Sequence, residues 1–396
     1  MKHLFFILFL GLIACSEGKY NNIPEKYHNL LDKALATAGN NAIELQTALE
    51  KAPAEQKEGM AFLISYMPER DLKELKADFI LENSAYAYKA REQFSWAKQI
   101  PDSIFFNEVL PYVSLNEKRE NWRKEFFDRF SKYVVNCSDI FEAIDSINQN
   151  VRDEVMVDYS TKRKKPDQAP FESMEQHLAS CTGLSIILTD AFRAVGIPSR
   201  VAGTPNWHDE RGNHNWTEVW ANGKWYFTEY YFPGQLDNAW FFADAGKAIK
   251  NNREKAIYAS SFKPTGISFP LVWDENIKYV AAENVTDRYT ELYRKYLASI
   301  STDGNHVSLR VMAFKNKNQD KESDDRVAVN LDIFEGSKQM GGGRTSGPTQ
   351  DMNDVLTFAL EKNKTYTIKY ADSKGKLQEV KVKLDDKSSE VKIYME

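Results

Sequence analysis

The chain has 396 residues, of which 42% are hydrophobic and 28% are charged. This supply of apolar side chains is enough for two or three ordinary globular domains. The formal net charge is −5, and the charged residues are spread along the chain without a basic stripe. Nucleic-acid-binding proteins usually carry such a stripe, so nucleic acid is excluded as an expected partner.

The first residues, MKHLFFILFLGLIAC, have the pattern of a secretory signal. Lys2 precedes an apolar run that ends at Ile13 and is too short to span a bilayer. The last four residues of this segment resemble the lipobox of bacterial lipoproteins. The resemblance implies that residues 1–14 are removed, that Cys15 is lipidated, and that the protein is extracytoplasmic and anchored to a bacterial membrane, in the periplasm or at the cell surface. The alternative is ordinary secretion with an unmodified Cys15.

With Cys15 lipidated, Cys137 and Cys181 are the remaining thiols of the mature chain. With two thiols, the disulfide framework that is common in exported proteins is not expected. Such a chain either avoids cysteine or uses one for chemistry. Cys137, in VVNCSDIFEA, is expected to be a buried thiol near the start of a helix, and we assign it no role.

Residues 20–157 are expected to form a helical N-terminal region. Segments such as EKYHNLLDKALATA and SDIFEAIDSINQNV place apolar residues three and four positions apart, which is typical of amphipathic helices. No internal repeat is evident. The polar stretch STKRKKPDQAPFES that follows is expected to be an exposed loop that enters the next unit, residues 158–300.

The central unit is expected to combine one buried helix with an antiparallel sheet. Apolar residues from Leu184 to Val195 follow helical spacing, and Gly196 and Pro198 end the pattern, which predicts a helix from about Ser180 to Gly196. The dipeptide Asn222-Gly223 is a strong signal for a two-residue hairpin turn. The strands expected after the helix are Ser199–Ala202, His214–Trp220 and Lys224–Glu229.

Residues 304–396 are expected to form a small β-sandwich. From His306 onward the sequence alternates apolar and polar residues, as in VSLRVMAF, TYTIKYA and EVKIYM, and a glycine-rich loop, GGGRTSG, interrupts the alternation. This unit resembles carboxypeptidase regulatory-like or transthyretin-like sandwiches. The chain as a whole is therefore predicted to be an α+β protein.

Cys181 is a candidate nucleophile because it heads the predicted buried helix. Unpaired backbone N–H groups and the helix dipole favour a thiolate at a helix start. Position alone is weak evidence, since free cysteines are more often buried structural residues.

The hairpin supplies a candidate base and a candidate acid. A two-residue turn at Asn222-Gly223 places Trp220 opposite Trp225 and Trp216 opposite Glu229. Because His214 and Trp216 are two residues apart on one strand, they share a face of the sheet, and Glu229 becomes the diagonal neighbour of His214. A carboxylate there can fix the imidazole tautomer and stabilise the imidazolium, leaving the other ring nitrogen to activate a thiol.

Other histidines leave alternatives open. His177 and His208 flank this region, and their placement is more typical of polar loop residues than of a catalytic base. A zinc site is conceivable from His208, Asp209 and His214, but neither paired cysteines nor an HExxH spacing accompanies them. We therefore expect no metal and no cofactor.

The combined motifs resemble the transglutaminase-like superfamily, which has a papain-like core. SCTGLSIILTDAFRAVGIPSRVAGTP followed by GNHNWTEVWANGKWYF has the Cys motif, helix end and HxWxEVW strand of that superfamily in the same order. The resemblance covers roughly residues 166–233 and implies that Cys181 is the nucleophile and His214 the general base. Glu229 stands where the family usually has an aspartate, and a slip of one residue in the hairpin would put it on the wrong face.

Three further residues are candidates around this core. KPDQAPFES resembles a preamble that recurs before the Cys motif in bacterial members, and Gln168 within it is a candidate oxyanion donor beside the Cys181 backbone N–H. The alternative is a loop glutamine without a role in catalysis. This alternative is favoured because the separation of Gln168 from Cys181 in the sequence does not determine where its side chain lies. Trp216 and Trp220 are candidates for lining a substrate cleft, although tryptophans on a hairpin more often pack in a core.

These features predict a thiol acyl-transfer enzyme. His214 would deprotonate Cys181, and a thioester would form and be hydrolysed, with a peptide, protein or glycopeptide as the substrate. Members of this superfamily include transamidating enzymes, peptidases, peptide N-glycanases and inactive proteins, so the fold does not choose the reaction. Two alternatives stay open: a catalytically idle module that binds a peptide or glycan, and a peptide N-glycanase-like amidase.

Overall fold

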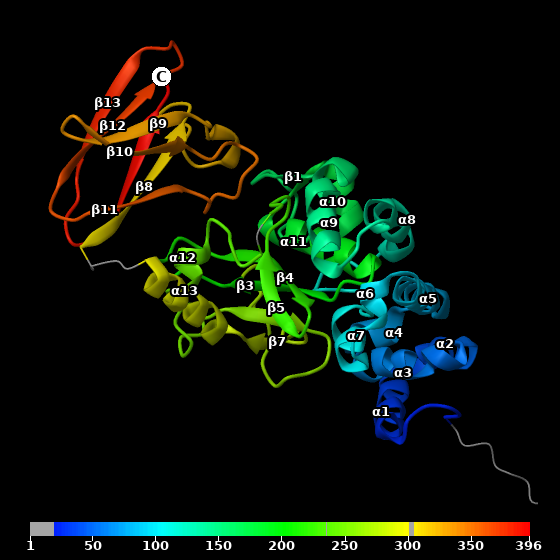
Figure 1. The fold of residues 1–396 in the computed structure, drawn as a ribbon. Coiled ribbons are helices and arrows are strands. Elements are labelled where there is room, and N and C mark those ends of the chain that lie inside the picture. Colours follow the sequence, from blue (N-terminus) through cyan, green and yellow to red (C-terminus); the bar gives the residue numbers. More distant parts are fainter. Residues whose placement is uncertain (1–19, 235, 301–304) are drawn as a thin grey trace, which may run out of the picture.

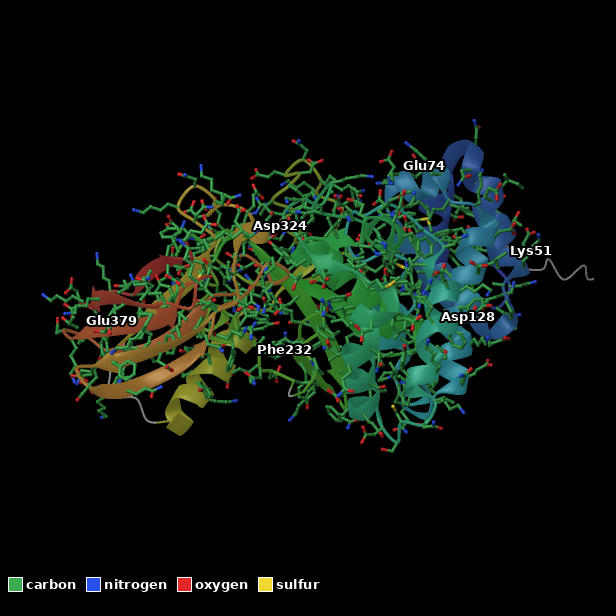
Figure 2. The ribbon with its side chains drawn as sticks, turned by 90° about the horizontal axis from the view of Figure 1, so that it is seen from above. Lys51, Glu74, Asp128, Phe232, Asp324 and Glu379 are labelled. Atoms are coloured by element: carbon green, nitrogen blue, oxygen red, sulfur yellow. The ribbon has the colours of Figure 1, made fainter. Side chains whose placement is uncertain are left out.

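The computed structural model describes residues 20–234, 236–300 and 305–396. A helical region, a mixed core with a five-stranded sheet and a two-sheet β unit follow one another along the chain (Figure 1). Seen from above, the helical region and the β unit lie at opposite ends of the core (Figure 2). The predicted α+β fold class is confirmed. The predicted signal and Cys15 lie outside the described residues.

The N-terminal region is helical, as the three- and four-residue spacing predicted. Its helices are α1 His28–Ala38, α2 Ala42–Lys51, α3 Lys57–Tyr66, α4 Glu69–Glu74, α5 Ala77–Gln93, α6 Ser95–Lys98, α7 Asp102–Glu108, α8 Trp122–Val134 and α9 Ile140–Val155. Their apolar faces join those of the central helix and sheet in one hydrophobic core that runs from Ile23 to Ala221. The division predicted at residues 157 and 158 therefore separates elements that share a core.

The central helix is α11, Cys181–Ala194, which confirms the helix predicted here. The Oγ of Ser180 accepts a hydrogen bond from the Gly183 backbone N–H at 3.1 Å and so caps the first turn. Every residue of α11 after Cys181 is buried, because the helix packs against the sheet on one side and against α8 and α9 on the other. Gly196 ends it with a φ of +75°, a conformation that favours glycine.

The sheet of the core has the strand order β5-β4-β3-β6-β7, with all neighbours antiparallel. Its strands are β3 Ser199–Thr204, β4 His214–Ala221, β5 Lys224–Thr228, β6 Tyr258–Ser261 and β7 Ala281–Asn284. The hairpin register is as predicted, with Trp220 opposite Trp225. Asn222 and Gly223 both have positive φ, at +49° and +86°, as the predicted two-residue turn requires.

Shorter elements complete the core. A parallel pair of two-residue strands lies before α11. One short helix lies between β5 and β6, and a longer helix follows β7. These elements are β1 Asp158–Tyr159, α10 Pro170–Gln176, β2 Leu178–Ala179, α12 Phe242–Ala245 and α13 Thr286–Ile300. In the described part of the chain, no helix is both long enough and apolar enough to cross a membrane.

The C-terminal unit consists of two sheets around a hydrophobic core of its own, with the orders β10-β9-β12-β13 and β11-β8-β14. The strands are β8 His306–Phe314, β9 Asn330–Glu335, β10 Lys338–Arg344, β11 Leu356–Glu361, β12 Thr365–Ala371, β13 Leu377–Lys383 and β14 Ser389–Tyr394. We call this unit the sandwich. The loop between β10 and β11, residues 345–355, reaches from the sandwich to the core (Figure 1). We call it the sandwich loop.

Candidate active site

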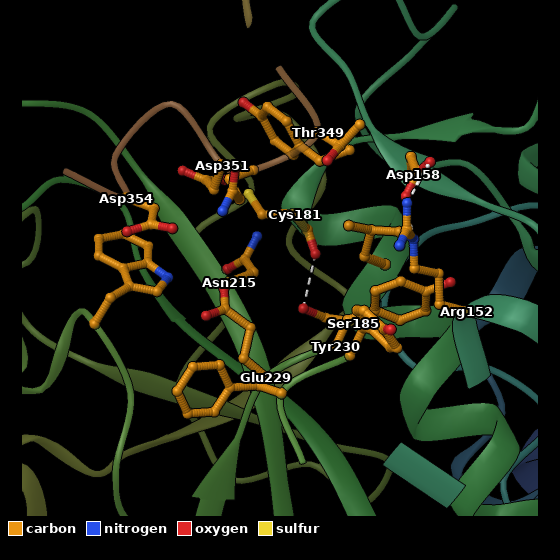
Figure 3. A pocket seen from close by; sticks show the side chains of 16 residues that line it. Arg152, Asp158, Cys181, Ser185, Asn215, Glu229, Tyr230, Thr349, Asp351 and Asp354 are labelled. Atoms are coloured by element: carbon orange, nitrogen blue, oxygen red, sulfur yellow. Dashed lines mark hydrogen bonds and ion pairs between the residues drawn. The ribbon is translucent and has the colours of Figure 1, made fainter. Parts of the chain in front are cut away.

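Cys181 opens α11 at the wall of a cavity of about 490 Å³ (Figure 3). Its side chain is partly exposed, whereas the rest of the helix is buried. The first backbone N–H groups of a helix have no partner within the helix, and the helix dipole places partial positive charge there. The start of α11 therefore favours a negative charge on the sulfur of Cys181 or on an oxygen bound beside it in the cavity.

His214, the first residue of β4, lies fully buried beside Cys181. The ring of Trp240 covers it, with the two ring centroids 4.8 Å apart. A ring nitrogen of His214, the Sγ of Cys181 and a carboxylate oxygen of Asp351 all lie within 4.8 Å of one another. The structure thus brings together the thiol and the imidazole that the sequence singled out.

Glu229 lies immediately after β5, with its Oε1 2.8 Å from the Nε2 of His214. The length is that of a charged hydrogen bond, but the angles depart from the ideal, so we describe the contact as an ion pair. Asn148 of α9 holds this segment, because its amide nitrogen donates to Glu229 O at 2.9 Å and its Oδ1 accepts from the Phe232 N–H at 2.7 Å. Asp237, another acidic residue that follows β5, accepts from the Phe227 backbone N–H and not from His214.

A second carboxylate approaches His214 from the sandwich. The Oδ2 of Asp351 lies 3.4 Å from the Nδ1 of His214, on the ring nitrogen that Glu229 leaves free. Figure 3 shows Asp351 and Asp354 of the sandwich loop at the cavity, with Glu229 below them in this view. The sequence did not predict this contribution from the C-terminal unit.

These neighbours shift the protonation of the site. Burial lowers the pKa of His214, but the negative charges of Asp351 and Glu229 raise it more, leaving that pKa well above its ordinary value. Burial raises the pKa of Asp351, but the charge of His214 lowers it by more. The pKa of Asp351 therefore lies below its usual range. Burial, together with the charge of Glu229, raises the pKa of Asp354 to about 6. The negative charges on either side of the ring therefore favour the imidazolium form of His214.

Residues 128–230 match the sequence pattern of the transglutaminase-like superfamily. The chain carries a transglutaminase-like domain. The matched range begins inside α8 and ends just after Glu229, so it contains Cys181 and His214 but not the sandwich.

The other two comparisons add little to this match. A comparison with curated proteins found no significant relative. Among solved structures, an inferred cysteine protease from Cytophaga hutchinsonii is 12% identical, with a TM-score of 0.28. The similarity covers 35% of this chain and 45% of that one, which is less than half of either.

Two residues of the transglutaminase-like motif, Gly203 and Asn215, hold the start of α11 against the sheet. Gly203 of β3 pairs with Asn215 of β4, and a Cβ at residue 203 would lie 1.8 Å from the Oδ1 of Asn215. A glycine is therefore required for Asn215 to adopt this rotamer. Its amide nitrogen then donates to the Oγ1 of Thr182 at 2.7 Å and fixes the first turn of α11 to the sheet.

The structure corrects three of the candidates from the sequence. Gln168 is fully buried, and its amide nitrogen donates to Leu178 O at 2.8 Å and to the Oγ of Ser173 at 3.3 Å. These bonds satisfy the amide within the fold, so Gln168 does not face the cavity as an oxyanion donor. Trp216 is also fully buried and lies in the core beneath His214. Trp220 lines a separate cavity of about 270 Å³ between the hairpin and the helical region.

Other side chains line the cavity beside Cys181. Those that the sequence did not single out are Arg152, Asp158, Tyr159, Ser185, Asn215, Tyr230, Tyr231, Phe232, Trp240, Thr349, Gln350, Asp351 and Asp354. The three aromatic residues after Glu229 continue directly from the predicted strand, so the hairpin pattern could have suggested them. The residues of the sandwich loop carry no such signal, because they come from another folding unit.

The structure does not bring together the three residues that the sequence suggested as zinc ligands. His208 and Asp209 lie together with Asp244 and not with His214. His208 contacts Asp244 at 3.1 Å, and Arg211 pairs with both carboxylates. Since arginine already neutralises these carboxylates, the cluster is an ion-pair network. His177, the other alternative base, contacts Met156 O through its Nδ1 at 2.9 Å.

Proposed function

We propose that this protein is a thiol acyl-transfer enzyme that hydrolyses peptide or amide bonds. Cys181 acts as the nucleophile, His214 as the acid–base group and Glu229 as the acid that orients His214. One observation carries the proposal: the thiol of a cysteine at a helix start lies within 4.8 Å of a ring nitrogen of a buried histidine, and the Nε2 of that histidine lies 2.8 Å from a carboxylate oxygen. The match of this region to the transglutaminase-like superfamily supports it at the level of a cysteine-based enzyme.

The steps follow from these positions. The Cys181 proton leaves to His214, and the thiolate attacks the substrate carbonyl carbon, whose oxygen becomes an oxyanion near the first N–H groups of α11. The imidazolium then returns its proton to the leaving amine as the C–N bond breaks and a thioester remains. Water, deprotonated by His214, attacks the thioester and releases the acid and the thiol. Glu229 stabilises the imidazolium in both halves of the reaction.

The cavity supports a peptide or glycopeptide as the substrate. Its walls combine aromatic rings, among them Tyr230 and Trp240, with carboxylates, so they can contact both apolar side chains and backbone N–H groups. Hydrolysis requires only water as the acyl acceptor. A transamidating enzyme would also need a site for the acceptor amine.

The reaction class can be tested with three substrate pools: denatured proteins, glycopeptides and cell-wall fragments. We expect the wild-type protein to generate new N-termini from denatured proteins, detected by terminal labelling and mass spectrometry, and Cys181→Ala to generate none. Deglycosylation of glycopeptides would indicate the amidase instead. Binding without turnover, equal in both proteins, would indicate an idle binding module and contradict the proposal.

We further propose that the protein is lipid-anchored through Cys15 and acts outside the cytoplasm. The support is the lipobox-like sequence alone. Wild-type protein from its native host is expected to partition with membranes, whereas Cys15→Ala is expected to remain as precursor or to be released in soluble form. Mass spectrometry of the mature N-terminus checks this. An unmodified N-terminus other than Cys15 would show that the protein is secreted in another way.

A further inference from the structure

The sandwich loop is fastened to its own unit yet lies in the candidate active site. Arg326 of the sandwich donates one hydrogen bond to the backbone oxygen of Asp351, at 2.6 Å, and another to that of Asp354. Arg326 is itself buried. These bonds hold the loop on the sandwich, while Thr349 and Gln350 line the cavity beside Cys181 (Figure 3). A movement of the sandwich would therefore carry the loop with it.

Asp351 opposes the charge that thiol chemistry develops. Negative charge appears first on the sulfur and then on the substrate oxygen next to it. The Asp351 carboxylate is 94% buried and lies within 4.8 Å of the Cys181 Sγ. In a buried site, two negative charges at this distance repel each other strongly. A carboxylate at this position raises the free energy of both the thiolate and the oxyanion.

Asp351 also competes for the ring nitrogen that the reaction uses. Glu229 takes Nε2 at 2.8 Å, which leaves Nδ1 to exchange protons with the thiol and with the leaving group. The Oδ2 of Asp351 lies 3.4 Å from that nitrogen. A proton held towards this carboxylate is not directed at the leaving amine.

We propose that the sandwich loop is an autoinhibitory contact, in which Asp351 occupies Nδ1 of His214 and the approach to Cys181 until the sandwich moves away from the core. The inference rests on the proposed function, since it takes Cys181 as the nucleophile. In the released state Glu229 still holds the imidazolium, and Nδ1 is free to pair with the thiolate.

The contacts between the sandwich and the core suit such a release. Asn353 donates through its amide nitrogen to Asn213 O at 3.0 Å and accepts at its backbone oxygen from Arg211 at 3.2 Å. Further ion pairs join Arg310 to Asp209 and Lys162 to Asp324. Met352 adds an apolar contact. Interfaces rich in polar contacts permit domain motion, because opening them exposes little apolar surface.

The test uses the full chain and measures how fast Cys181 is alkylated by iodoacetamide and by the anionic reagent iodoacetate, with peptide mapping by mass spectrometry. We expect Asp351→Asn to raise the iodoacetate rate about tenfold and the iodoacetamide rate less, because a repelling carboxylate has been removed. Asn353→Ala loosens the loop but keeps Asp351, and is expected to raise both rates. Asp332→Asn removes a charge from the outer surface of the sandwich and serves as the control.

Each outcome bears on a separate statement. Asp351→Asn rates equal to or below the wild-type rates would overturn the autoinhibitory contact, and slower alkylation would make Asp351 a positioning residue for His214. A Cys181 that stays unreactive in every variant would instead contradict the proposed nucleophile. Cys137, which is half-buried and donates to Tyr133 O at 3.6 Å, reports unfolding in the same experiment. A variant in which Cys137 also reacts faster is unfolding and is set aside. The isosteric Asp351→Asn variant then decides whether Asp351 inhibits Cys181.

Discussion

Glu229→Gln is expected to lower kcat/KM by roughly three to four orders of magnitude while the protein stays folded. The carboxylate lies 2.8 Å from the Nε2 of His214 and supplies one of the two charges that raise the pKa of the imidazole. A neutral amide of the same shape keeps the packing but stabilises the imidazolium poorly. Cys181→Ala and His214→Ala are expected to abolish turnover, because each removes a group that takes part in bond making.

Two further variants sharpen this test. Glu229→Asp is expected to be partly active, since the shorter carboxylate can still approach the imidazole. Asp237→Asn is expected to retain near wild-type kcat/KM, because Asp237 contacts the Phe227 backbone rather than His214. Rates are measured on the peptide pool that the wild-type protein cleaves, with circular dichroism to verify folding. Full activity in Glu229→Gln would mean that Asp351 serves as the acid, or that the site works as a cysteine–histidine pair.

The part of the site that local rules determine could be predicted from the sequence. A two-residue turn at Asn222-Gly223 fixes the hairpin register, and the register alone brings Glu229 beside His214. Apolar spacing and the glycine and proline at the helix end likewise define α11, which presents Cys181. Each of these features depends on residues close together in the sequence, where turn chemistry and side-chain periodicity decide the geometry.

The rest depends on contacts that no local pattern encodes. Asp351 reaches His214 because the sandwich packs against the core, and its segment, GPTQDMNDV, has only the composition of a turn. Gln168 fails as an oxyanion donor because backbone and hydroxyl oxygens of its own segment take its amide. Trp216 shares a face with His214, as the alternation requires, but the structure covers that face with Phe241 and Tyr289.

A second large effect is expected at Glu218, the glutamate of the HxWxEVW motif. Its side chain is fully buried, with Oε2 2.9 Å from the Nε of Arg200 and Oε1 accepting from the Tyr289 hydroxyl at 2.6 Å. Arg200 and Glu218 also face each other in the β3–β4 register, and Arg288 pairs with the same carboxylate. This motif residue therefore holds the sheet together and does not contact Cys181 or His214 in any described interaction.

Glu218→Ala is accordingly expected to lower the free energy of unfolding by about 3–5 kcal/mol, because it leaves the buried guanidinium of Arg200 short of a partner. Glu218→Gln keeps a hydrogen-bond acceptor and should cost less. Urea unfolding followed by tryptophan fluorescence measures this in the helical region and the core without the sandwich, since all 8 tryptophans precede the sandwich. Glu69→Ala, which breaks the exposed pair between Glu69 and Lys73, is the matched control and should change stability by under about 0.5 kcal/mol. A Glu218→Ala protein as stable as this control would show that Glu283, which lies 2.8 Å from Arg200, compensates the buried charge without Glu218.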